Sequence, residues 1–211
     1  MIRANIKETE LVFETDDEVF SPKYIDPGTL AMLSETDFLP GDRVLDLGCG
    51  YGVVGILAAK LIGEENVVMC DISGKAAECA MKNAALNGVG NVKILQSDGF
   101  ENITGNDFTL ILSNPPYHAD FSVPKYFIEQ GFGRLALGGR MVMVTKRLDW
   151  YKNKLTSVFG GVKVKETGGY YVFTAEKRSS SVKHKSKPVQ KLSKKLRRKY
   201  QGAAGNEPTG H

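Results

Sequence analysis

Short apolar runs rich in β-branched residues alternate with amphipathic stretches along most of this chain. The apolar runs predict strands at residues 44–47, 67–70, 92–95, 108–112 and 141–145. The amphipathic stretches predict helices near residues 29–34, 53–62, 74–86, 123–135 and 148–159. Because apolar strands separated by helices are typical of a parallel sheet buried on both faces, we expect an α/β fold with helices on both sides of the sheet.

The two ends of the chain depart from this alternation. Residues 162–166 alternate in polarity, a Thr-Gly-Gly turn follows, and residues 170–174 run back, which predicts an antiparallel hairpin. Five parallel strands and this hairpin give a seven-stranded, mostly parallel sheet. Residues 1–42 contain short strands and a helix, and we expect them to pack on a catalytic core formed by residues 43–176.

Charge is distributed unevenly along the chain. Residues 177–211 hold eleven Lys and Arg and one acid, a net charge of +10. Residues 1–176 hold 17 basic and 23 acidic residues, a net charge of −6. The basic segment has few large apolar side chains, so we expect a flexible tail that binds a polyanion such as RNA. A solvated tail without a partner is the alternative.

Composition narrows the class of protein further. The chain has 211 residues, 42% of them hydrophobic, which suits one soluble domain. The three cysteines, Cys49, Cys70 and Cys79, have no paired spacing, so we expect small buried side chains in a reducing cytoplasm and no metal site. The N-terminus has no signal-peptide pattern, and no apolar run is long enough to cross a membrane, so we expect no membrane partner.

A glycine-rich turn follows the first parallel strand. The sequence DLGCGYG at residues 46–52 lets the backbone turn tightly and approach a ligand closely. The same turn also contains G-x-G-x-x-G at residues 50–55, and Asp71 follows its middle glycine by 19 residues, near the spacing of an acid that holds ribose hydroxyls. Asp98, after the third strand, could accept a hydrogen bond from an adenine amino group or belong to an ordinary turn. These features predict an adenosine-containing cofactor, either NAD or S-adenosylmethionine.

The fourth strand ends in a more specific motif, Asn114-Pro115-Pro116-Tyr117. The two prolines stiffen the backbone and remove two N–H donors. The Asn114 side-chain oxygen and the Pro115 carbonyl can then both accept hydrogen bonds from one –NH₂ group. Held in this way, a planar amine would aim its lone pair at an electrophilic methyl group, and Tyr117 would offer a face on which a base stacks.

These two motifs together resemble the class I, Rossmann-like amino-methyltransferases. Within that class the chain is most similar to the small-domain ribosomal RNA guanine-N2 methyltransferases. The sequence Phe20-Ser21 followed by DPGTL at residues 26–30 resembles the segment that precedes their core, and NPPYH at residues 114–118 resembles their target motif. The likeness covers about residues 10–176. It implies S-adenosylmethionine as the cofactor and an exocyclic amino nitrogen in RNA, above all guanine N2 of ribosomal RNA, as the target.

The resemblance also implies roles for individual residues. Seven would contact the cofactor: Gly48, Gly50 and Thr29 at its methionine end, Asp46 near its amino group, Asp71 at the ribose, and Ile72 and Asp98 at the adenine. Three would hold the target amine: Asn114, Pro115 and Tyr117.

Several alternatives remain open at this point. Many relatives carry Phe where this chain has Tyr117, and Tyr is also common in adenine-N6 and protein-glutamine methyltransferases. An NAD-dependent oxidoreductase would leave the Asn-Pro-Pro-Tyr motif without a task and lacks a clear acid–base set. In a non-catalytic RNA-binding module, only the basic tail would matter.

Overall fold

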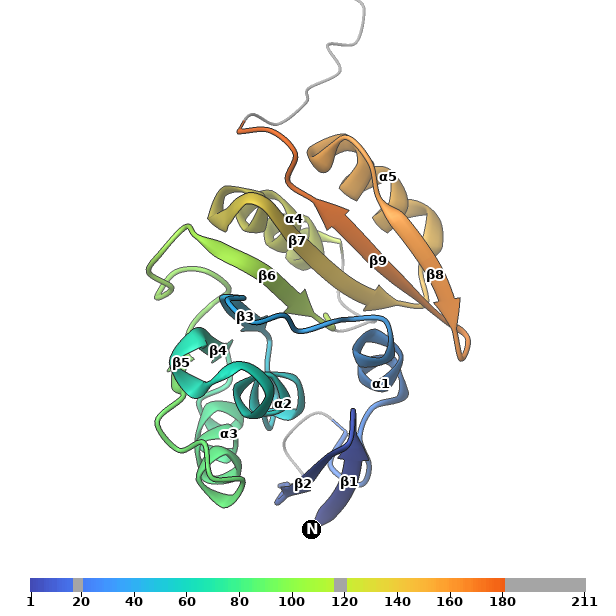
Figure 1. Cartoon of the computed structure of the whole chain (residues 1–211). Helices are drawn as coiled ribbons and strands as arrows, with labels where there is room; N and C mark the ends of the chain where they lie inside the picture. Colours follow the sequence, from blue (N-terminus) through green and yellow to red (C-terminus); the bar gives the residue numbers. More distant parts are fainter. Residues whose placement is uncertain (17–20, 116–120, 181–211) are drawn as a thin grey trace, which may run out of the picture.

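The computed structural model describes residues 1–16, 21–115 and 121–180 (Figure 1). The main strands are β3 (Val44–Leu47), β4 (Val67–Asp71), β5 (Lys93–Gln96), β6 (Phe108–Ser113), β7 (Leu135–Thr145), β8 (Lys163–Thr167) and β9 (Tyr170–Glu176). They form one sheet in the order β5-β4-β3-β6-β7-β9-β8. The first five are parallel, and β9 and β8 join as an antiparallel hairpin. The predicted seven-stranded, mostly parallel fold is confirmed.

Helices cover both faces of this sheet (Figure 1). One face carries α1 (Pro27–Ser34), α2 (Val53–Ile62) and α3 (Gly74–Leu86), and the other carries α4 (Ser122–Arg134) and α5 (Leu148–Phe159). A short 3-10 turn, Glu64–Asn66, leads into β4. The strands alternate strictly: Val44 joins the apolar cluster under α1–α3, and the next residue, Leu45, joins the cluster under α4 and α5. Both faces are therefore buried, as expected for central parallel strands.

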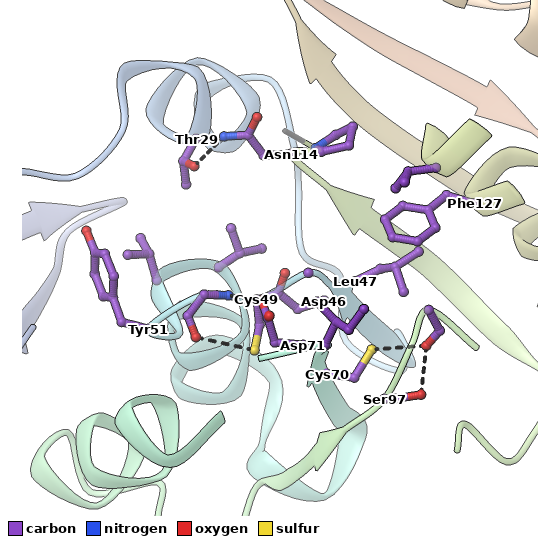
Figure 2. Close-up of a pocket in the computed structure, with 18 of the residues that line it drawn as sticks. Thr29, Asp46, Leu47, Cys49, Tyr51, Cys70, Asp71, Ser97, Asn114 and Phe127 are labelled. Carbon is purple, nitrogen blue, oxygen red and sulfur yellow. Dashed lines mark hydrogen bonds between the residues drawn. The ribbon is translucent and has the colours of Figure 1, made fainter. Parts of the chain in front are cut away.

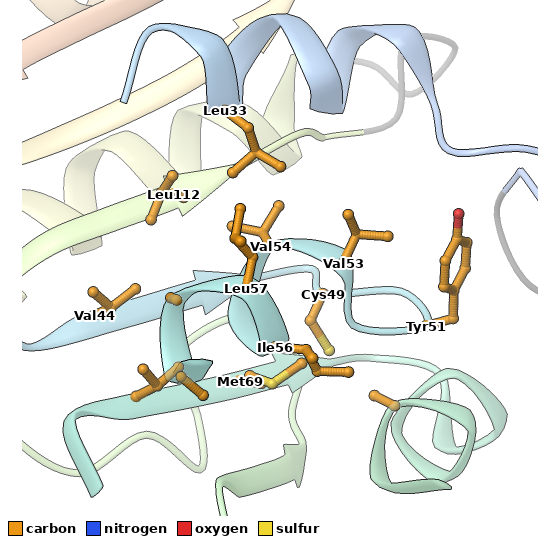
Figure 3. Close-up of a cluster of buried hydrophobic side chains, with 14 of the residues drawn as sticks. Leu33, Val44, Cys49, Tyr51, Val53, Val54, Ile56, Leu57, Met69 and Leu112 are labelled. Atoms are coloured by element: carbon orange, nitrogen blue, oxygen red, sulfur yellow. The ribbon is translucent and has the colours of Figure 1, made fainter. Parts of the chain in front are cut away.

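The apolar cluster on the first face fixes the position of α1 over the sheet (Figure 3). Leu33 of α1, Leu57 of α2 and Leu112 of β6 are all completely buried in it. Burial of such a side chain contributes about 1.5–3 kcal/mol. This packing holds the start of α1 near the end of β6, although the two segments are far apart in the sequence.

The start of β7 is where the sequence-based prediction was wrong. The strand begins at Leu135, directly after α4, and not at residue 141. Gly138 and Gly139, a residue pair typical of turns, form an irregularity within the strand: Phe108 pairs with Leu135 and Leu110 pairs with Arg140. A Cβ atom on Gly139 would lie 2.9 Å from two carbonyl oxygens, so a glycine is needed where the backbones approach so closely.

A small hairpin of β1 (Ile2–Ile6) and β2 (Thr9–Phe13) packs against α2 and α3. Two buried asparagines of this helical layer bind the backbone of the hairpin chain. The Asn87 amide accepts a bond from Val12 N–H (3.0 Å) and donates one to Val12 C=O (2.7 Å). Asn83 does the same with Glu14, at 2.8 and 2.9 Å. Side-chain amides thus take the place that a third strand would occupy.

Candidate active site

A cavity of about 330 Å³ opens at the carboxyl edge of the parallel strands (Figure 2). Its walls come from the loops after β3, β4, β5 and β6 and from α1 and α4. Nine predicted site residues line it: Thr29, Asp46, Gly48, Gly50, Asp71, Ile72, Asp98, Asn114 and Pro115. The tenth, Tyr117, lies outside the described residues, as do Pro116 and His118. The volume falls in the usual range for small-molecule sites.

The glycine-rich turn forms the floor of this cavity. The backbone N–H groups of Gly48 and Cys49 both donate to Cys70 C=O at 2.9 Å, which ties the turn to the end of β4. Gly48 and Gly50 have positive φ angles of 79° and 55°. Apart from the glycine itself and its two chain neighbours, no described residue has an atom within 4 Å of a Cβ built on Gly48 or Gly50, so both face open space. A side chain here would strain the backbone and fill the cavity where a cofactor would lie.

Asp71, the last residue of β4, is held by two backbone donors. Its Oδ2 accepts from Gly50 N–H and its Oδ1 accepts from Ser73 N–H, both at 2.9 Å. A carboxylate has about four lone-pair sites, so these bonds orient the group and still leave acceptor capacity for ribose hydroxyls. Ile72 follows with 64% of its surface exposed and lines the same cavity, as does exposed Asp98.

Asp46 is buried beneath the same turn. Only 2% of its surface is exposed, and its Oδ2 accepts from Gly55 N–H at 2.8 Å. Burial raises the pKa of Asp46 to about 7, the bond from Gly55 opposes this shift, and the nearby charge of Asp71 adds to it. A cation in the cavity would favour the ionised form, so Asp46 suits a ligand that carries an ammonium group.

The cysteines of this region are not reactive groups. Cys49 and Cys70 are buried, and burial raises the pKa of the Cys49 thiol well above its ordinary value and that of Cys70 to about 12. Both therefore remain thiols at neutral pH and cannot act as thiolate nucleophiles. Cys79 is also free and buried, so the prediction of small buried side chains is confirmed.

Asn114 and Pro115 form the wall opposite Asp71. Ser113, which ends β6, donates its hydroxyl hydrogen to Leu47 C=O at 2.8 Å and so fixes this strand end beside β3. The Asn114 Nδ2 lies 2.9 Å from Asp26 Oδ2. It also lies 3.0 Å from Thr29 Oγ1 (Figure 2). The motif predicted to hold a target amine therefore shares one cavity with the glycine-rich turn.

Sequence reasoning missed other residues that line the cavity, among them Asp26, Tyr51, Val123 and Phe127. Asp26 could have been recognised because an Asp before Pro at the first helical position is a strong N-cap signal. Val123 and Phe127 are four positions apart on α4 and so share a face. Periodicity reveals such a face but does not reveal that it meets a cavity.

The described residues contain no group of three His, Cys, Asp or Glu side chains that could hold a metal ion. Among the same residues, no helix is long and apolar enough to span a bilayer.

The sequence model of the family described as Methyltransferase small domain matches residues 10–174. The chain belongs to the methyltransferase small-domain family. This match confirms the predicted enzyme class and the resemblance on which it was based.

Individual relatives agree with this assignment. The uncharacterized protein YbxB of Bacillus subtilis is 32% identical over 179 residues, which cover 82% of this methyltransferase and 89% of YbxB. Ribosomal RNA small subunit methyltransferase C of Pseudoalteromonas atlantica is 33% identical over 160 residues, 74% of this chain and 46% of the relative.

A solved structure gives the same result. The Thermus thermophilus 16S rRNA N2 G1207 methyltransferase RsmC, in complex with AdoMet and guanosine, matches with a TM-score of 0.76 and 29% identity. The match covers 84% of this chain and 50% of the Thermus chain. Its cofactor agrees with the prediction of S-adenosylmethionine. The chain thus spans about half the length of the named ribosomal RNA methyltransferases that it matches.

Proposed function

We propose that this chain transfers a methyl group from S-adenosylmethionine to the exocyclic amino nitrogen of a base in RNA, with guanine N2 of ribosomal RNA as the first candidate. The observation that carries the proposal is the shared cavity: Asn114 and Pro115 line the same space as Gly48 and Asp71. A target amine held by the first pair would lie beside a cofactor held by the second pair.

The cofactor half supplies binding and orientation. The open backbone at Gly48 and Gly50 admits the methionine end, Asp46 attracts its ammonium group, and the oriented carboxylate of Asp71 receives the ribose hydroxyls. When bound, S-adenosylmethionine supplies a methyl group that is already activated by its sulfonium. The protein therefore needs no strong nucleophile of its own, and positioning supplies most of the rate enhancement.

The target half orients the amine. The Asn114 side-chain oxygen and the Pro115 carbonyl accept its two hydrogens, which leaves the nitrogen lone pair directed along a third line. Both acceptors also stabilise the positive charge that develops on the nitrogen during transfer. The N–CH₃ bond would form as the S–CH₃ bond of the sulfonium breaks, S-adenosylhomocysteine would leave, and the methylated nitrogen would then release one proton to water. Because this proton is lost after the transfer, the step requires no general base with a shifted pKa.

Guanine N2 is favoured over other amines by the relatives. The named curated relatives are ribosomal RNA small subunit methyltransferases, and the Thermus structure contains guanosine. The basic tail supports an RNA partner, although residues 181–211 lie outside the described part of the chain.

The test is transfer of labelled methyl groups to total RNA and to total protein from cells that lack this gene, followed by nucleoside analysis. We expect label in small-subunit ribosomal RNA as N2-methylguanosine. Label in N6-methyladenosine would instead indicate an adenine-N6 methyltransferase, and label in protein glutamine would indicate a protein-glutamine methyltransferase. These are the two alternatives that Tyr117 left open. Assembled subunits and naked RNA, assayed side by side, would identify the form of the substrate. Calorimetry with S-adenosylhomocysteine and with NAD tests the cofactor independently.

A further inference from the structure

The side chain of Asn114 is held by the N-cap of α1 and by one residue of that helix, which lie 88 and 85 positions away. Its Nδ2 donates to Asp26 Oδ2 at 2.9 Å and to Thr29 Oγ1 at 3.0 Å. An amide –NH₂ has two hydrogens, so these two bonds use both of them. Both acceptors are buried, with 9% and 8% of their surfaces exposed.

These bonds fix which way the amide points. If the Asn114 amide were flipped, its oxygen would face the buried Asp26 carboxylate, and two acceptors would meet without a hydrogen between them. Such a contact costs at least the free energy of the lost hydrogen bonds. Figure 2 shows the nitrogen of Asn114 directed at Thr29, with the oxygen at the other end of the amide. The Asn114 side-chain oxygen, which is the acceptor, is thus kept on the side of the amide that faces away from α1.

The same carboxylate oxygen also caps the N-terminus of α1. Asp26 is the N-cap, and its Oδ2 accepts from Thr29 N–H at 2.9 Å. One oxygen atom therefore joins the start of the helix to the end of β6. Pro27 at the first helical position fixes the backbone there and removes a competing donor.

We propose that Asp26 and Thr29 are positioning residues for methyl transfer, which keep the Asn114 oxygen in place to accept from the target amine. This inference rests on the proposed function. Asp26 has a second effect, because a hydrogen bond to a carboxylate polarises the amide and makes its oxygen a stronger acceptor. The target nitrogen gains positive charge during transfer, and the negative charge of Asp26, relayed through the amide, stabilises it.

Four variants separate the two effects. Asp26→Asn retains an N-cap and an acceptor oxygen but removes the charge, and we expect kcat to fall about tenfold. Thr29→Val removes one of the two bonds to Asn114, and we expect kcat to fall about tenfold. Thr29→Ser retains the hydroxyl, and we expect its kcat to lie within about twofold of the wild-type value. Asp26→Ala removes the charge, the N-cap and the bond to Asn114 together, and we expect kcat to fall about a hundredfold. The affinity for S-adenosylhomocysteine and the KM for RNA stay within about threefold in Asp26→Asn.

The control is Asp37→Asn, which removes an exposed carboxylate outside the cavity and should leave kcat unchanged. Unchanged kcat in both Asp26→Asn and Thr29→Val would overturn the proposal. So would a loss of cofactor affinity as large as the loss of kcat, because it would indicate a merely structural role. If Asp26→Ala does not fold, the other variants still decide the question.

A measurement without turnover separates this inference from the proposed function. The Asn114 side-chain –NH₂ should give ¹⁵N–¹H signals that exchange slowly with solvent in the wild type and faster in Thr29→Val. Equal exchange in both proteins would refute the positioning contacts, even if RNA is methylated. Slow wild-type exchange without methyl transfer to RNA would support the contacts and overturn their use in RNA methylation.

Discussion

The two halves of the cavity are built in different ways. On the cofactor side, Asp71 accepts from Gly50 N–H in the glycine-rich turn, and Asp46 accepts from Gly55 N–H near the start of α2. Each donor lies within 21 positions of its acceptor along the chain. On the target side, Asn114 depends on Asp26 and Thr29, which belong to a distant segment. The proposed cofactor site is therefore built from contacts between residues near in sequence, whereas the proposed target site depends on the docking of α1 to orient Asn114.

This difference predicts that substitutions on the two sides change different quantities. The cofactor side should control the dissociation constant of the cofactor, and the target side should control kcat.

The largest effect is expected for Asn114→Ala. Loss of the acceptor should lower kcat at least about a thousandfold, while the affinity for S-adenosylhomocysteine stays within about tenfold. Single-turnover methyl transfer and calorimetry measure the two quantities. Asn91→Ala, an exposed amide outside the cavity, is the matched control. An Asn114→Ala enzyme with near-normal kcat would remove this residue from the mechanism.

Asp71→Ala should show the opposite pattern. The change removes the proposed partner of the ribose and the acceptor for Gly50 N–H, and we expect about a hundredfold weaker binding of S-adenosylhomocysteine. At saturating cofactor, kcat should change by no more than about threefold. If kcat fell and binding did not, the two halves would not be separable as described.

A smaller effect is expected from the basic tail. Deletion after Arg178 should weaken RNA binding about tenfold near physiological salt and flatten its salt dependence, because fewer counterions are released. Cofactor affinity should not change. Binding isotherms at several salt concentrations test this, and an unaltered slope would mean that the tail does not contact RNA.

The smallest effect concerns pH. Because the pKa of Asp46 lies at about 7 in the folded chain, binding of a cofactor with an ammonium group should strengthen about fivefold between pH 6 and 8 as Asp46 ionises. Asp46→Asn should remove this dependence.

The stability of the cofactor-free chain should change with pH in the opposite direction to cofactor binding. The folded-state pKa of Asp46 is raised above its ordinary value of 3.8, so its contribution to stability is fully present below pH 4 and is lost as pH rises through 7. The melting temperature of the wild type relative to Asp46→Asn should therefore decrease between pH 4 and 8. A constant difference would mean that Asp46 titrates normally.

The sequence was sufficient to predict those structural features that depend on residues close together along the chain. Apolar alternation located the parallel strands, and Asp71 was expected at a strand end, where β4 does end. The start of β7 could not be predicted, because Gly138 and Gly139 are typical of turns and only the neighbouring strand reveals the close approach that requires them.

The target side shows the same limit. The motif at Asn114 was recognisable because its residue types are unusual together, and Thr29 was expected on the cofactor. The bonds from Asn114 to Asp26 and Thr29 span more than 80 positions, so no local pattern could reveal them. The position of Tyr117 stays a prediction.

The two asparagines that bind the N-terminal hairpin have a consequence for solubility. A short two-stranded sheet has an edge with unpaired backbone groups, which can recruit strands from other molecules. Asn83 and Asn87 cover this edge at Val12 and Glu14 with amides from the chain's own helix. A strand added at this edge would first have to displace these four hydrogen bonds, and alanine at either position would remove two of them.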